Sequence, residues 1–284
     1  MNIEEARTLL QSTGGQQFYI PSIKRDLLFK HLTTGIQKVI GRTLLSGVDN
    51  YHADLSRLGL FDEMLLEGTR EHKSSQLTVI DVIAFVAQIK ATTNKTAERD
   101  IECPACSVGA TLTIDLEKVI ENCKKYEFKR LTIGLETADK KYEFLLRDIK
   151  WIDDLILKQS TNILRNELSE TLLESSIFYA YNKVCLYIES IKINGDEVKS
   201  NSGESFHKWE VPDRIAFFDH LPQKITISDE EDSSLINVVK KEFDETIITS
   251  DIFSNAIAIK YESDHSKCDF DLGGAVSYDT FFSI

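Results

Sequence analysis

The spacing of apolar residues predicts several helices along the chain. Residues 77–90, LTVIDVIAFVAQIK, are apolar on nearly every face, which is typical of a helix in the middle of a core. Thr78 and Asp81 have the spacing of a capping box, in which side chains bond the free amide groups of the first turn. Helical spacing also occurs in residues 1–12, 33–47, 51–67, 152–187 with a break near 166–169, 211–222 and 229–245.

Shorter alternating runs predict β-strands, most of them in hairpins. Asn194-Gly195 in SIKINGDEV favours a tight hairpin turn. Because strands and helices follow one another without regular alternation, we expect an α+β fold with a helical core and several β-hairpins. The other predicted strands are 17–20 and 26–30, AERDIEC and ATLTIDL, RLTIGLE and KKYEFLLR, and NAIAIKYES and FDLGGAVSYDTFF.

The length and composition set limits on the domain organisation. The chain has 284 residues, of which 42% are hydrophobic and 28% are charged, so it is globular and can bury a substantial core. We expect an N-terminal α+β half, residues 1–150, and a C-terminal α+β half, residues 151–284. One interleaved domain remains the alternative.

The net charge bears on the choice of partners. A charge of −13 repels phosphate backbones and argues against broad nucleic-acid binding. No apolar run has the length of about 18–20 residues that a membrane span needs, so no membrane partner is expected. The first residues do not resemble a signal peptide, which indicates synthesis in a reducing cytoplasm.

Two short cysteine-containing turns are the main chemical feature. Cys103 and Cys106 form a Cys-x-x-Cys pair between two predicted strands, and His265 and Cys268 form a His-x-x-Cys pair in the last predicted hairpin. We call these two turns the knuckles. Together they supply three cysteines and one histidine, a standard tetrahedral zinc set, and two knuckle-bearing hairpins could form a zinc-ribbon-like unit with one structural zinc.

A second interpretation of the knuckles stays open. The first knuckle can be no more than a tight turn, because nothing in the sequence proves that two such distant segments meet. Cys123 and Cys185 lie in apolar or helical patterns and are expected to be small core residues.

No catalytic signature is present, so we expect a protein that is not an enzyme. The sequence lacks the phosphate-binding loop, the dinucleotide fingerprint, the nucleophile elbow and the metalloprotease motif. The acidic run 229–232 is expected to be a solvated helix start, and Asp81 a capping residue. His207 and His220 are expected in surface or loop-packing positions.

Several stretches resemble the baseplate hub proteins of T4-like contractile-tailed bacteriophages. FYIPSIKRDLLFKHLTTGIQKVIGRTLLS is similar to that family's opening strand pair and helix, and SSQLTVIDVIAFVAQIKATT to its central helix. YIESIKINGDEV and RIAFFDHLP resemble a later hairpin and short helix, and SYDTFFSI its terminal strand. The second knuckle departs from the family, because it contains His265 where a cysteine pair is expected.

The resemblance implies a structural or assembly protein of the tail baseplate, located in the virion and made in the host cytoplasm. It would bind other baseplate and tail proteins without catalysis. Phe281 and Phe282 are candidate anchors for a partner pocket, with burial in this chain's own core as the alternative. A rival function is a zinc-ribbon binding module associated with a nucleic-acid machine.

Overall fold

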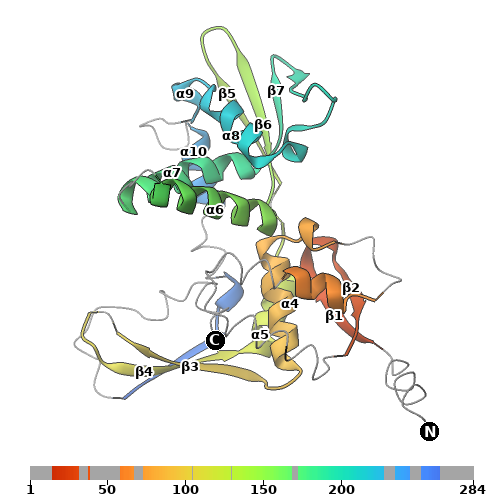
Figure 1. The fold of residues 1–284 in the computed structure, drawn as a ribbon, viewed down its shortest axis with the longest axis vertical. Helices are drawn as coiled ribbons and strands as arrows, with labels where there is room; N and C mark the ends of the chain where they lie inside the picture. The colour runs from red at the N-terminus through yellow and green to blue at the C-terminus, as the bar shows by residue number, and fades with distance from the viewer. Residues whose placement is uncertain are drawn as a thin grey trace. The chain divides into compact units, whose positions relative to one another are not determined.

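A computed structural model describes residues 15–31, 38, 58–66, 73–103, 105–128, 130–167, 172–226, 234–243 and 251–262 (Figure 1). The chain contains both α-helices and antiparallel β-sheets, as the sequence predicted. It divides into two compact units. Unit 1 comprises residues 1–126 and 252–284, and unit 2 comprises residues 127–251. Unit 1 is therefore built from both ends of the chain.

The first layer of unit 1 is a hairpin packed on a buried helix. β1 (Gln16–Ile20) and β2 (Arg25–Phe29) pair antiparallel around the short helix η1 (Pro21–Ile23), which confirms the predicted strands. The rings of Phe18, Phe29, Phe61 and Phe85 lie with centroids 5.0–6.0 Å apart and form the centre of this core. Aromatic pairs at such separations contribute beyond their buried area.

Helix α4 (Val79–Ala91) begins where the sequence predicted. The Thr78 side chain accepts a hydrogen bond from the Asp81 amide, and the Asp81 carboxylate accepts one from the Thr78 amide, so the capping box is confirmed. Residues 58–64 are also helical, but Leu65 forms a β-bridge with Phe29. The prediction of a helix as far as residue 67 was therefore wrong at its end, because pairing with β2 overrides helical propensity there.

The second layer of unit 1 is a three-stranded sheet in the order β3-β4-β9, which we call sheet C. β3 (Thr96–Glu102) and β4 (Gly109–Asp115) form the predicted hairpin, and helix α5 (Leu116–Lys125) follows β4 directly. β9 (Ile257–Tyr261) pairs antiparallel with β4, so a strand near the end of the sequence lies beside one near residue 110 (Figure 1). The short helix η3 (Ser74–Gln76) precedes α4.

Unit 2 combines a four-stranded antiparallel sheet, in the order β5-β6-β7-β8, with a group of helices. Asn194 and Gly195 adopt φ angles of 55° and 93°, the left-handed values of the predicted hairpin turn. Pro212 stands in the first turn of its helix, as predicted. The elements are β5 (Leu131–Glu136), β6 (Lys141–Leu146), α6 (Trp151–Glu167), α7 (Leu172–Leu186), β7 (Ile188–Ile193), β8 (Asp196–Glu197), η4 (Phe206–Lys208), α8 (Val211–Asp219), α9 (Gln223–Thr226) and α10 (Leu235–Phe243).

The helical predictions of unit 2 are confirmed where they can be followed. The segment predicted as helical from 152 to 187 forms α6 and α7, and the predicted break near 166–169 falls largely outside the described residues. The predicted helices 1–12 and 33–47 and the acidic run 229–232 also lie outside them, apart from the single described residue 38. Within the part of the chain that is described, no helix is both long and apolar enough to cross a membrane.

Candidate metal centre

The first knuckle is a tight turn between β3 and β4. The Cys103 amide donates to the Val108 carbonyl at 3.0 Å, and the Ser107 amide donates to the Cys103 carbonyl at 2.8 Å. Ser107 adopts a φ of 56°, a left-handed conformation that closes the turn. The backbone therefore holds the two cysteines on one small loop whose shape the sheet fixes.

The two knuckle cysteines differ in their surroundings. Cys103 is fully buried and packs with Ala110 against Ile101, Ile259 and Tyr261, while Cys106 is exposed. Cysteine thiolates are ligands that zinc prefers, so the pair is chemically able to supply two ligands of a metal site.

Strand β9, the third strand of sheet C, ends beside the first knuckle. Tyr261 lies opposite Ala110, and the Glu262 amide donates to the Gly109 carbonyl at 2.9 Å. The Glu262 carboxylate lies directly over Gly109, so that a side-chain carbon at residue 109 would collide with it. Glu262, the residue after β9, therefore lies opposite Gly109, which follows Cys106 by three residues in the sequence. The pairing of β9 with β4 could not be predicted from the sequence, because no local pattern specifies which strands pair.

The structure places only part of the proposed ligand set. Cys103 and Cys106 are described, whereas His265, Cys268, Phe281 and Phe282 lie outside the described residues. Among the residues that the structure does describe, no three histidine, cysteine or acidic side chains gather as a metal-binding group. The structure therefore describes two of the four predicted ligands, and the other two follow Glu262 in the sequence.

The other two described cysteines are core residues, as predicted. Cys123 and Cys185 are both fully buried. Burial raises the pKa of the Cys123 thiol well above its ordinary value, and burial raises the pKa of Cys185 to about 12. Both thiols stay protonated at neutral pH, which makes them poor metal ligands or nucleophiles.

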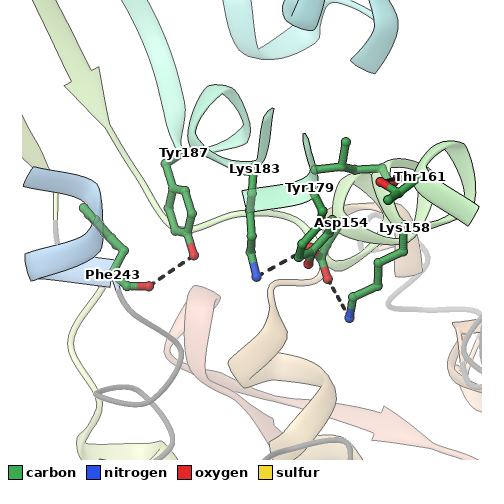
Figure 2. A network of polar contacts seen from close by, with 8 residues as sticks. Asp154, Lys158, Thr161, Tyr179, Lys183, Tyr187 and Phe243 are labelled. Carbon is green, nitrogen blue, oxygen red and sulfur yellow. Dashed lines mark hydrogen bonds and ion pairs between the residues drawn. The ribbon is translucent and has the colours of Figure 1, made fainter. Parts of the chain in front are cut away.

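A network of polar side chains in unit 2 was not foreseen from the sequence. Figure 2 shows the Asp154 carboxylate of α6 between Lys158, Lys183 and Tyr179. Tyr179 donates to it at 2.6 Å, Lys158 lies at 3.0 Å and Lys183 at 3.6 Å. Nearby, the Tyr187 hydroxyl donates to the Phe243 carbonyl at 3.2 Å, which joins the end of α7 to α10 (Figure 2).

The electrostatics of this network are those of a structural ion pair. Burial by itself would raise the pKa of Asp154, but Lys183 and Lys158 outweigh it and hold the pKa below its ordinary value. The carboxylate is therefore charged at neutral pH and fully engaged. The network joins α6 to α7 within unit 2.

His207 is half-buried and His220 is exposed, in line with the predicted surface or loop-packing positions. His207 donates from Nδ1 to the Glu189 carbonyl at 3.1 Å, and His220 donates from Nδ1 to the Ala216 carbonyl at 2.6 Å. Burial, reinforced by the charge of Arg147, lowers the pKa of His207, so its ring is neutral at pH 7.

Comparison with known proteins does not extend these observations. No family model, curated protein or solved structure matches the chain.

Proposed function

We propose that the protein is a structural or assembly component of a phage tail baseplate, in the hub region, and that it acts by binding other baseplate subunits without catalysis. The observation that carries the proposal is the resemblance of several stretches to the baseplate hub proteins of T4-like phages. Three kinds of element implied by that resemblance occur in the described residues: the β1–β2 strand pair, the buried helix α4, and the β7–β8 hairpin followed by α8.

The buried polar groups support a role in shape. Asp81 ties the turn between β1 and β2 to α4, because the Ser22 amide donates to its carboxylate at 2.8 Å. Asp154 ties α6 to α7 through Lys183 and Tyr179. Both carboxylates therefore hold elements of their own unit together, as a protein that fixes the geometry of its neighbours requires.

We further propose that one structural zinc stiffens the end of sheet C. Its ligands would be Cys103 and Cys106 from the first knuckle, and His265 and Cys268 from the second. The support is the β4–β9 register, which brings Glu262 to Gly109. His265 is three residues further along the chain, so its Cα can lie no more than about 11 Å from that of Glu262. The two knuckles are thus within reach of each other.

The donor set fits zinc rather than a harder cation. Three thiolates and one imidazole form a closed tetrahedral set, whereas calcium and magnesium prefer oxygen ligands. A bound zinc would link the returning C-terminal segment to the β3–β4 hairpin and would contribute to the folding free energy of unit 1.

Assembly with tail proteins tests the main proposal. The protein should co-purify with baseplate subunits of a T4-like phage when they are expressed together, and it should form a discrete complex in size-exclusion chromatography. The set of subunits to use is one that assembles only incompletely when this protein is left out. Failure of the protein to associate with any baseplate or tail subunit of that set would contradict the proposal.

The aromatic pair near the end of the sequence offers a sharper variant of that experiment. If Phe281 and Phe282 are anchors, their joint replacement by alanine should weaken the complex by at least about tenfold, as loss of a central aromatic anchor does. The matched control is Leu28→Ala, because Leu28 is a large apolar residue that is 39% exposed in unit 1. Equal binding by both variants would remove the assigned role of the pair.

One observation favours a second candidate function, a zinc-ribbon binding module that serves a nucleic-acid machine. Sheet C brings the Cys-x-x-Cys turn and the last residue of β9 to the same end of the sheet, as a ribbon requires. Binding of this kind would weaken steeply with added salt, because it depends on contacts to phosphates. A fluorescence titration with duplex and single-stranded DNA at low and high salt separates the two candidates.

A further inference from the structure

Unit 2 contains a second group of charges in which cations outnumber carboxylates. We call it the cation cluster. Its cations come from the segment before β5, from the segment between β6 and α6, from η4 and from α8. Its carboxylates come from α6 and β7. The cations are Arg130, Arg147, Lys150, Lys208 and Arg214, and the carboxylates are Asp153 and Glu189.

Each carboxylate of the cluster lies in one ion pair, although Asp153 Oδ2 and Glu189 Oε2 have no well-formed hydrogen bond within the described residues. Arg214 Nη2 lies 2.8 Å from Asp153 Oδ2, and Arg130 Nη2 bonds Glu189 Oε1. Arg147 and Lys150 form no ion pair with a carboxylate in the described part of the chain. Arg147 is therefore attracted to Asp153 and Glu189, and Lys150 to Asp153, only from beyond the distance of an ion pair.

Burial makes this excess costly. Arg214 is only 1% exposed, and its Nε and Nη1 are buried without a hydrogen-bond partner among the residues that the structure describes. The Nε and Nη2 atoms of Arg147 are buried in the same condition. Buried guanidinium groups normally find acceptors for their donors, since an uncompensated charge in a low dielectric is expensive.

The cations also repel one another. Burial lowers the pKa of Lys150, and Arg147, Arg214 and Lys208 lower it further against the opposing effect of Asp153. Burial likewise lowers the pKa of Arg147, where Arg214 and Arg130 act in the same direction. A water molecule could accept hydrogen bonds from these groups, but it would not offset their charge.

We propose that the cation cluster binds a small, doubly charged oxyanion of the phosphate type. Lys150 is half-buried and Lys208 exposed, so these two ammonium groups can reach the ligand from the surface. Arg147 and the deeply buried Arg214 supply positive potential from beneath, where solvent screens it little. The inference concerns unit 2 alone and does not depend on a role in the tail baseplate.

Thermal unfolding of the full chain, followed by tryptophan fluorescence, tests this inference. Both tryptophans, Trp151 and Trp209, lie in unit 2 and report on the cluster's surroundings. Sodium phosphate at pH 7 is compared with sodium chloride of the same ionic strength. We expect phosphate to raise the unfolding midpoint by about 3 °C or more at saturation, as binding to the folded state alone requires.

Two variants locate the effect. Lys150→Gln removes the charge, keeps a polar end and shortens the side chain by only one atom, and it should weaken phosphate binding by about tenfold or more, as loss of a charged contact does. Lys140→Gln makes the same change at an exposed residue of the β5–β6 turn and should bind as the wild type does. Isothermal titration with phosphate gives the affinities directly and does not depend on the stability of either variant.

Two results would overturn the inference. The first is an unfolding midpoint that is the same in phosphate as in chloride, together with no heat of phosphate binding. That result would mean that the folded protein tolerates the excess charge without a bound anion. The second is equal phosphate affinity in wild type and Lys150→Gln, which would place the anion elsewhere.

Discussion

Asp81 in unit 1 and Asp154 in unit 2 are both fully buried, and their surroundings move their pKa values in opposite directions. Asp81 accepts hydrogen bonds from the Ser22 amide at 2.8 Å, the Thr78 amide at 2.9 Å and the Thr78 hydroxyl at 3.0 Å. All these donors are neutral. Asp154 instead has two lysines within 4 Å, in addition to the Tyr179 hydroxyl.

The difference shows what neutral donors can and cannot do for a buried charge. Burial raises the pKa of Asp81, and its hydrogen bonds offset only part of that effect. For Asp154, the cations more than compensate for burial. Unit 1 therefore holds a buried carboxyl group whose charged form is disfavoured, while unit 2 holds a buried ion pair.

The largest effect should come from removing the charge of Asp154. Asp154→Asn leaves Lys183, whose side chain is 11% exposed, without its anion, and we expect the free energy of unfolding to fall by about 3 kcal/mol. Urea unfolding followed by tryptophan fluorescence measures it, since both tryptophans are in unit 2. Asp139→Asn, in the exposed β5–β6 turn, is the matched control and should change little. Equal stability of the two variants would show that the ion pair contributes nothing.

The same substitution at Asp81 should cost less. Asp81→Asn retains one acceptor for the amides of Thr78 and Ser22 and removes a charge that burial already disfavours. We expect a loss of about 1–2 kcal/mol, the usual cost of impairing a helix cap or a buried hydrogen bond. Far-UV circular dichroism during urea unfolding measures it in unit 1, which lacks tryptophan. A loss larger than that of Asp154→Asn would reverse the comparison.

The two aspartates should also give opposite pH dependences. The folded pKa of Asp154 is lowered from 3.8, so its contribution is complete above that pH and is lost as the pH falls through the folded value. The folded pKa of Asp81 is raised from 3.8, so its contribution is complete below that pH and is lost as the pH rises through the folded value.

The variants separate these two contributions. Asp81→Asn should lose less stability than the wild type between pH 4 and pH 7, whereas Asp154→Asn should lose less than the wild type on acidification below pH 4. Urea midpoints across this range measure both slopes. An unchanged slope in Asp81→Asn would mean that its carboxyl group titrates as it does in the unfolded chain.

The smallest effect should come from Lys158. Its side chain is 27% exposed and lies one helical turn from Asp154, where such pairs contribute about 0.5 kcal/mol or less. Lys158→Met should therefore lower the stability only slightly, because Lys183 and Tyr179 still engage the carboxylate. Tryptophan-monitored urea unfolding detects this directly. A loss approaching that of Asp154→Asn would assign the ion pair to Lys158 instead of Lys183.

The comparison also shows which features could be predicted from sequence. The capping box of Thr78 and Asp81, the Asn194-Gly195 turn and the position of Pro212 depend on neighbours in the sequence, and all three were predicted. The contact of Asp154 with Lys183 joins two helices, so no local pattern indicates it. The strand β9 was predicted as a strand, but its pairing with β4 was not.

The candidate site shows the same division. The first knuckle was predicted as a hairpin turn because alternating residues flank Cys103 and Cys106. The burial of Cys103 was not predicted, because it depends on contacts with Ile259 and Tyr261, which are distant in the sequence. The excess of cations around Arg214 also arises only in the folded unit, since its members are spread from residue 130 to residue 214.

The metal content of the full-length protein tests the central claim about sheet C most directly. Protein purified without a histidine tag or chelators should contain about one zinc per chain by elemental analysis. Cys103→Ser and Cys106→Ser should each lose it together with thermal stability, and Cys123→Ala, which changes a buried core thiol of the same unit, should keep it. A wild-type protein without zinc, or zinc retained in both knuckle variants, would contradict the claim that the two knuckles meet around a metal.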